Sequence, residues 1–139
     1  MSGETDLKIL LQHMEPVLNS GEYVFCKVGY LHEIPDIEKL VFFFREKEAI
    51  TVVLEKPVAE KWNLEYNYVS SWITLSIHSS LEAVGLTAAF ANALKHEGIS
   101  CNVVAAYFHD HIFVAKHDAE KAIEALKAMK VGNTVGFFR

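Results

Sequence analysis

The order of secondary structure between residues 72 and 129 constrains this chain more than any other feature. Apolar runs rich in β-branched residues predict three strands there, and apolar positions three and four residues apart predict two helices. A strand-to-helix turn beside a second strand end is where such a fold binds a small ligand. In chain order we expect a strand Trp72 to His78, a turn Ser79 to Gly85, a helix Leu86 to Glu97, strands Cys101 to Ala105 and His111 to Val114 around a polar link Tyr107 to Asp110, and a helix Asp118 to Lys130.

The first half of the chain predicts a less regular version of the same order, which suggests an internal repeat. Ser70-Ser71 is the expected seam, and no Gly-, Ser- or Pro-rich linker separates the halves. We therefore expect two units, residues 1–70 and 71–139, that share one core. The expected elements are a helix from Leu7 to Met14, a turn Asn19 to Gly21, strands Glu22 to Val28, Ala49 to Leu54 and Glu65 to Val69, a short helix followed by a strand or turn near Phe43 between Ile37 and Glu48, a helix Lys56 to Trp62, and a closing edge strand Val135 to Phe138.

Composition excludes several classes of protein. The apolar fraction of 51% is enough to fill a core. The formal net charge is −5 and the basic residues form no run, which argues against nucleic-acid or anionic-membrane partners. Cys26 and Cys101 lie far apart in expected strands, so we predict free thiols in a reducing compartment. The acidic N-terminus does not resemble a signal peptide and no apolar run approaches about 20 residues, so a soluble cytoplasmic protein is expected.

The turn from Ser79 to Gly85 is the first candidate for ligand binding. A glycine at the start of a helix lets a ligand approach, and free N–H groups at a helix N-terminus attract a carboxylate. For a free amino acid, Glu82, the Asn102 amide oxygen or strand-end carbonyls would accept hydrogen bonds from the ammonium group. The alternative is a structural turn, in which the glycine only permits helix packing and the serines only cap it.

His109-Asp110-His111 is the second candidate. The two imidazoles alternate along a strand and would share a face, and with His78 or Asp110 they would offer three ligands to a divalent metal. The alternatives are hydrogen bonding to a ligand or an interface, and a hairpin turn in which Asp110 bonds backbone amides. A catalytic role has less support, because the sequence lacks a Gly-x-Ser-x-Gly motif and a Gly-rich phosphate loop, and Cys101 lies in a core strand pattern.

Two strings resemble the ACT domain family, namely the residues from Trp72 to Phe90 and those from Gly98 to Val104. With His109 to His111 and Gly21 to Phe25, the match extends to small bacterial proteins with two tandem ACT-like units. The resemblance implies an α+β fold of ferredoxin-like βαββαβ units in tandem, with an antiparallel sheet and helices on one face. It also implies dimerisation and binding of amino acids or similar effectors. The family turn has an acid, a variable residue, Pro and Gly, whereas this chain has Glu82-Ala-Val-Gly85.

Together these observations predict a non-enzymatic, amino-acid-binding regulatory module that forms a homodimer and acts on a protein partner. No cofactor, no resident metal and no catalytic residue are expected. The runner-up is a dimerisation module that binds no ligand, and a third possibility is a small metal-dependent enzyme using the histidines. The predicted ligand-binding residues are Ser79, Ser80, Leu81, Glu82, Val84, Gly85, Asn102, His109, Asp110 and His111.

Overall fold

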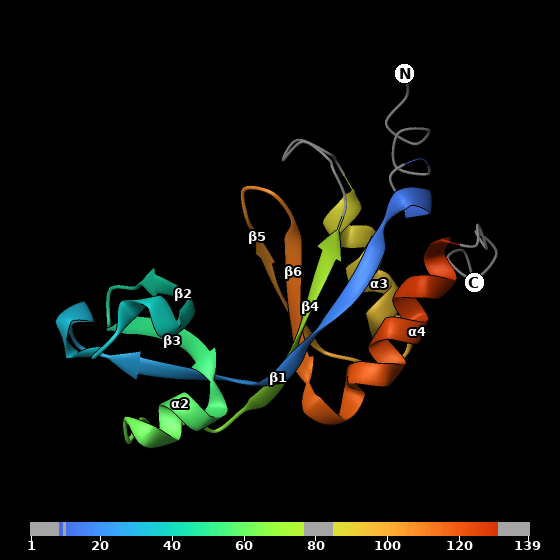
Figure 1. Cartoon of the computed structure of the whole chain (residues 1–139). Coiled ribbons are helices and arrows are strands. Elements are labelled where there is room, and N and C mark those ends of the chain that lie inside the picture. The colour runs from blue at the N-terminus through green and yellow to red at the C-terminus, as the bar shows by residue number, and fades with distance from the viewer. Residues whose placement is uncertain (1–8, 10, 77–84, 131–139) are drawn as a thin grey trace. The chain divides into compact units, whose positions relative to one another are not determined.

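The computed structural model describes residue 9 and residues 11–76 and 85–130, and it contains both strands and helices (Figure 1). Described residues 9 and 11–13 are helical, within the predicted first helix. The remaining elements, in chain order, are β1 Glu15–Val28, two short 3-10 turns Leu31–Glu33 and Ile37–Lys39, β2 Leu40–Arg45, β3 Ile50–Glu55, α2 Lys56–Lys61, β4 Val69–Ser76, α3 Leu86–His96, β5 Cys101–Ala105, β6 Asp110–Ala115, a 3-10 turn Lys116–Asp118, and α4 Ala119–Lys130.

The chain divides into two compact units, and two long strands belong to both. Unit 1 comprises Met1–Asn19 and Trp72–Arg139, and unit 2 comprises Ser20–Ser71. The hydrogen-bonded strand order is β2-β3-β1-β4-β6-β5, and β1 and β4 each run from one unit into the other. Unit 2 therefore has the order β2-β3-β1-β4, and unit 1 has the order β5-β6-β4-β1. The prediction of residues 1–70 and 71–139 as successive units stays a prediction.

Each unit has the strand order of a ferredoxin-like sheet. Counted from its own first strand, unit 2 places its strands 2-3-1-4. Unit 1 has the same arrangement when counted from β4, with the start of β1 in the fourth position. The pairs β1–β3, β2–β3 and β5–β6 are antiparallel. The predicted α+β fold with two ferredoxin-like units is therefore confirmed. The expected edge strand Val135 to Phe138 lies outside the described residues.

The core of unit 1 lies between the sheet and two helices on the same face of it. Ile73 and Leu75 alternate along β4 toward the helices, and Phe90 and Leu94 face them from α3. Leu11 and Met14 extend this core from the N-terminal segment. Burial of apolar side chains at period 2 from strands and period 3.6 from helices stabilises both kinds of element together. The remaining buried members are Leu86, Ala89, Ile99, Ile112, Val114, Ala122, Leu126 and Met129.

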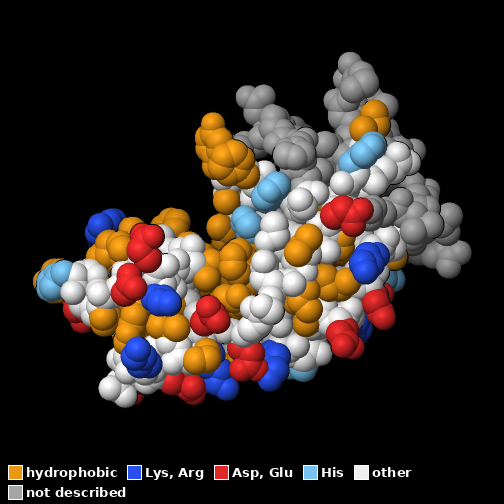
Figure 2. Space-filling view, in the orientation of Figure 1, with side chains coloured by type: hydrophobic (Ala, Val, Ile, Leu, Met, Phe, Trp, Pro, Cys, Tyr) orange, Lys and Arg blue, Asp and Glu red, His pale blue; other side chains and the backbone are white. Residues whose placement is uncertain are grey.

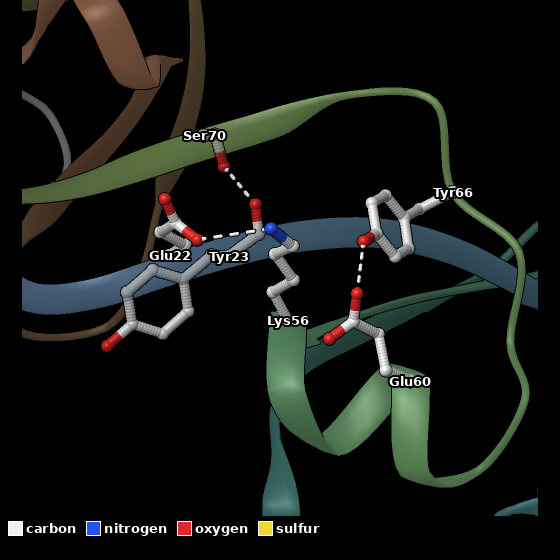
Figure 3. A network of polar contacts seen from close by, with 6 residues as sticks. All are labelled: Glu22, Tyr23, Lys56, Glu60, Tyr66 and Ser70. Carbon is white, nitrogen blue, oxygen red and sulfur yellow. Dashed lines mark hydrogen bonds and ion pairs between the residues drawn. The ribbon is translucent and has the colours of Figure 1, made fainter.

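Unit 2 has a smaller core and only one α-helix. Val52 and Leu54 of β3 pack with Val24 and Cys26 of β1 and with Ala59 of α2. Its polar contacts are drawn in Figure 3. The buried Ser70 hydroxyl donates to the Tyr23 carbonyl at 2.8 Å, Lys56 pairs with Glu22 at 3.5 Å, and the Tyr66 hydroxyl donates to Glu60 at 2.8 Å.

Two predictions in the first half are wrong, and tertiary contacts explain both. Asn19 to Gly21 is not a turn but lies within β1, because the Asn19 amide donates across the sheet to the Trp72 carbonyl at 3.2 Å and to the Thr74 hydroxyl at 3.0 Å. Glu65 to Val69 is not a strand. The chain there folds back on α2, where Leu64 N–H bonds the Ala59 carbonyl at 2.9 Å, and β4 begins only at Val69.

No helix among the described residues has both the length and the apolar character needed to cross a membrane.

Candidate ligand-binding site

The start of α3 is the part of the predicted binding turn that the structure describes. Gly85 precedes the helix in the left-handed conformation, with φ +86°, and its carbonyl accepts the first helical hydrogen bond from Ala89 N–H at 2.9 Å. A glycine has no side chain with which to cap the helix, and the first turn carries no acidic residue. The positive end of the helix dipole is therefore not balanced from within the helix. The predicted residues Ser79, Ser80, Leu81, Glu82 and Val84 lie outside the described residues.

The second candidate, around the histidines, lies on a tight hairpin. Ala105 pairs with Asp110, and Ala106 N–H donates to the His109 carbonyl at 3.0 Å, which closes the turn. Asp110 is therefore the first residue of β6, and its expected role as a turn residue is wrong. Figure 1 shows β4 ending at the same end of the unit 1 sheet as this hairpin tip, and Thr74 of β4 contacts His111.

Asp110 and His111 face opposite sides of the sheet. Successive side chains alternate along a strand, so Asp110 shares the face of Ile112 and Val114, which pack in the core beneath α3 and α4. Burial raises the pKa of the Asp110 carboxyl, and the nearby His111 and His109 imidazoles offset this only in part. A cation brought to the Asp110 carboxylate would stabilise its charged form.

His111 belongs to a hydrogen-bonded group on the other face, which we call the open face. Its Nδ1 atom lies 3.0 Å from Trp72 Nε1 and 3.1 Å from the Thr74 hydroxyl, which in turn accepts from Asn19. An indole N–H can only donate, so Nδ1 of His111 must be the acceptor and the ring is neutral with its proton on Nε2. Burial lowers the pKa of His111, and the charge of His109 lowers it further.

The free energy of unfolding is expected to depend on the protonation of His111. Its pKa in the folded protein is below that of the unfolded chain, about 6.5, so the unfolded chain takes up the proton first. The contribution of His111 is therefore present above about pH 6.5 and is lost as the pH falls through the folded pKa. Thermal unfolding of the protein and of His111→Asn between pH 8 and 5 should give a stability difference that shrinks toward acid.

This comparison removes the contribution of the histidines that do not contact His111, and the remaining difference includes the coupling of His111 to its neighbours His109 and Asp110. A stability difference that is the same at pH 8 and pH 5 would show that the Trp72 contact does not depend on a neutral imidazole.

Asn102 does not join the start of α3. It is exposed on β5, in register with Phe113, and it shares the open face with His111, whose partner on β5 is Val104. The helices cover the opposite face, so the expected role of Asn102 as an acceptor for an ammonium group held at Gly85 is not supported by its position.

The described residues do not assemble a metal site or a thiol nucleophile. No three His, Cys, Asp or Glu side chains among them come together in an arrangement that holds a metal. The rings of His109 and His111 are 6.4 Å apart between centroids, and the Nδ1 atom of His111 is already occupied. Burial raises the pKa of the Cys101 thiol, which disfavours the reactive thiolate.

Unit 2 has a surface hollow at the corresponding place, where its first strand ends beside its hairpin. The hollow has a volume of about 370 Å³. Glu46 N–H donates to the Ala49 carbonyl at 3.0 Å, the same bond that closes the turn from Ala106 to His109. The two hairpin turns are 60 positions apart, 106 minus 46. The lining residues are Gly29, Tyr30, Leu31 and the run from Arg45 to Ile50.

The open-face partners of His111 were not among the predicted site residues. Trp72 and Thr74 alternate with the core residues Ile73 and Leu75, so the strand pattern placed them together on the other face. Asn19 could not be found in this way, because its contact to β4 joins residues 53 and 55 positions apart.

Comparison with known proteins shows which family models and which solved structures this chain resembles. Two models of the ACT domain match the chain, one over residues 2–71 and the other over residues 67–128. A search of curated protein sequences gave no match. Among solved structures, a protein of unknown function from Vibrio cholerae, described as a possible transport protein, is 48% identical with a TM-score of 0.84, and the match covers 93% of this chain and 99% of that one.

More distant structures share the fold. A protein from Agrobacterium tumefaciens is 17% identical, with a TM-score of 0.64 over 84% of this chain and 89% of its own. The ligand-free regulatory subunit of aspartate kinase from Thermus thermophilus is 10% identical, with a TM-score of 0.58 over 82% of this chain and 95% of its own. The two matching models together span most of the sequence, and their description agrees with the resemblance of the strand, turn and helix around Gly85, so the chain belongs to the ACT domain family.

Proposed function

We propose that this ACT protein is a non-enzymatic regulatory module that binds an amino acid at the end of unit 1 where α3 begins. The proposal rests on two opposite charge preferences at one end of unit 1, where Figure 1 shows both the start of α3 and the hairpin end of β6, which begins at Asp110. The start of α3 favours an anion, and the carboxylate of Asp110 favours a cation on the helix-covered face.

A free amino acid offers both charges on neighbouring atoms. Its carboxylate would accept hydrogen bonds from the N–H groups of Leu86 and Thr87 in the first turn of α3. Its ammonium group would donate a hydrogen bond to the Asp110 carboxylate, which takes the role that the sequence analysis gave to Asn102. Gly85 would then have two roles, because its positive φ precedes the helix and its lack of a Cβ lets the ligand approach the backbone.

The regulatory step would be a difference in affinity between two arrangements of the protein. A ligand that binds one arrangement more tightly shifts the population toward it, and a partner chain responds to that population. ACT membership supports a small-molecule regulatory role, and a structure with the same fold, aspartokinase III from E. coli, was solved in complex with aspartate and ADP, so an amino acid is the first ligand class to test. No catalytic residue is assigned.

Thermal unfolding in the presence of each of the twenty amino acids tests this proposal. A ligand at about 100 times its dissociation constant adds about 2.7 kcal/mol to the free energy of unfolding. For a chain of this size, that amount raises the unfolding midpoint by several degrees. We expect one amino acid, or one chemical subset, to raise it.

The same screen with divalent metals separates the alternatives. A shift with a metal alone would favour a histidine site over the amino-acid site. No shift with any amino acid would contradict the proposal and favour a dimerisation module without ligand.

A further inference from the structure

The two units have the same hairpin end but different side chains on it. Positions in the two hairpins differ by 60, 106 minus 46, as the bonds that close their turns show. Ile50 therefore corresponds to Asp110, and Arg45 to Ala105, and in each hairpin these two residues pair across the strands. The unit 2 hollow, which Arg45 and Ile50 line, is thus the counterpart of the end of unit 1 proposed to bind the amino acid.

The carboxylate that would hold an ammonium group in unit 1 has no equivalent in unit 2. Where unit 1 has Asp110, unit 2 has Ile50, which is 6% exposed and packs in the unit 2 core. An aliphatic side chain accepts no hydrogen bond. The nearby Glu46 does not replace Asp110, because it accepts a hydrogen bond from the hydroxyl of Thr51, which faces the side of the sheet opposite to Ile50.

Unit 2 also has a cation where unit 1 has none. Directly opposite residues of an antiparallel pair share a face, so Arg45 lies beside Ile50 on the face that Ala105 occupies in unit 1. An arginine guanidinium stays charged, and it would repel the ammonium group of a ligand in the hollow. The central turn residues Lys47 and Glu48 add no net charge. Figure 2 shows basic and acidic side chains intermixed on the visible face of unit 2, so the side chain opposite Ile50 decides the local preference.

A side chain of unit 2 itself supplies a carboxylate at the segment that follows its first strand. The Glu33 carboxylate accepts the Tyr30 N–H at 2.7 Å, and a Cβ on Gly29 would lie 3.1 Å from the same carboxylate. Glu33 is the third residue of its 3-10 turn, whereas the third residue of α3 is Ala88, which has no acceptor. An acid at this position binds backbone N–H groups that a ligand would otherwise use.

We infer that each chain binds one amino acid, in unit 1, and that Glu33, Arg45 and Ile50 exclude a second one from the hollow of unit 2. This inference rests on the proposed function, because the excluded molecule is the amino acid proposed for unit 1. The hollow, of about 370 Å³, has the volume of a small-molecule site, so its chemistry and not its size excludes the amino acid. Glu33 supplies from within the chain the carboxylate that unit 1 would receive from its ligand. Ligand-dependent changes therefore begin in unit 1.

The first test is the number of amino-acid molecules bound by each chain. The titrant is whichever of the twenty amino acids raises the unfolding midpoint most. Calorimetric titration of the full chain should saturate at one equivalent. Two equivalents would overturn this inference and leave the proposed function standing, whereas no binding by any of the twenty would overturn both.

The second test gives unit 1 the cation of unit 2. Ala105→Arg places a guanidinium beside Asp110, and Ala105 is exposed, so the fold should be kept. The dissociation constant of the amino acid should rise about 10-fold or more, because the arginine pairs with the carboxylate and repels the ammonium group. Ala105→Met is the matched control, with a long uncharged side chain, and it should keep the wild-type affinity. Equal affinities in the arginine and methionine variants would overturn the inference.

The third test gives α3 the acid that unit 2 has in its turn. Ala88→Glu, at an exposed position, should bind N–H groups at the start of α3, weaken amino-acid binding about 10-fold or more and leave the unfolding midpoint unchanged or higher. Asn92→Glu adds the same charge one helical turn later, where the dipole effect has fallen off, and should bind like the wild-type protein. An Ala88→Glu variant that binds as tightly as Asn92→Glu would overturn the role assigned to Glu33.

Discussion

Replacing Phe90 with alanine is expected to lower the free energy of unfolding by about 3–5 kcal/mol. Phe90 has no exposed surface and is one of the largest fully buried side chains among the described residues. It lies in the unit 1 core, where the loss of its ring leaves a cavity as well as removing buried apolar area. Urea unfolding followed by circular dichroism measures the difference.

Asn92→Ala is the matched control for this substitution, because Asn92 is exposed on the same helix. It should change the free energy of unfolding by no more than about 0.5 kcal/mol. A loss below 1 kcal/mol in Phe90→Ala would contradict the packing of α3 on the sheet.

Because β1 and β4 run through both units, we also expect one unfolding transition instead of two.

Replacing Thr87 with glutamate is expected to reduce amino-acid affinity by about 10- to 100-fold while leaving the protein slightly more stable. Thr87 is exposed in the first turn of α3, where a negative charge interacts favourably with the helix dipole, by about 0.3–1 kcal/mol. The same charge would repel a ligand carboxylate bound there. Calorimetric titration of the amino acid found by the stability screen, together with the unfolding midpoint, measures both effects.

Thr87→Gln is the control for shape, because glutamine has nearly the same size as glutamate and carries no charge. It should keep most of the affinity. Equal affinity in Thr87→Glu and the wild-type protein would place the ligand carboxylate away from α3. The two effects of the glutamate have opposite signs, so general damage to the fold cannot produce the expected result. Substitution of Gly85 is a weaker test, since its positive φ strains any other residue.

The elements of unit 1 could be predicted because local pattern and tertiary packing agree there. Leu86, Phe90 and Leu94 recur at helical spacing, and all three are buried under the sheet. Gly98 ends this helical segment in a left-handed conformation, φ +74°, as a glycine after a helix does. In such segments a single sequence contains most of the information that determines the structure.

The long strand β1 could not be predicted for the opposite reason. Its turn-forming residues, Asn19 to Gly21, lie within the strand, and Asn19 is bonded to a strand more than fifty residues away. The internal repeat could be inferred from the order of elements but not from residue identity, because few identical residues carry it. Lys56, Ala59, Glu60 and Lys61 recur 60 positions later as Lys116, Ala119, Glu120 and Lys121, where each unit leaves its third strand for a helix.

Some features of the candidate site could likewise be predicted from the sequence, and others could not. The alternation of Asp110 and His111 along a strand could be predicted from the sequence, and these two side chains do face opposite sides, whereas His109, expected on the same strand, lies in the turn before β6. The sequence does not show which face of the sheet the helices cover, and this face determines whether Asp110 or Asn102 lies toward α3. The Trp72 contact that fixes the tautomer of His111 also depends on the register of two distant strands.

The most direct test of an amino-acid site at the start of α3 is a nuclear magnetic resonance titration of the ¹⁵N-labelled protein, whose mass is 15.7 kDa. The titrant is the amino acid that stabilises the protein in the unfolding screen, or an equimolar mixture of all twenty. Binding at the start of α3 should give saturable shifts of the backbone amide signals of Leu86, Thr87 and Asp110, with little change at Asn102. Saturable shifts confined to unit 2, or no shift at any amide, would show that the amino acid does not bind there.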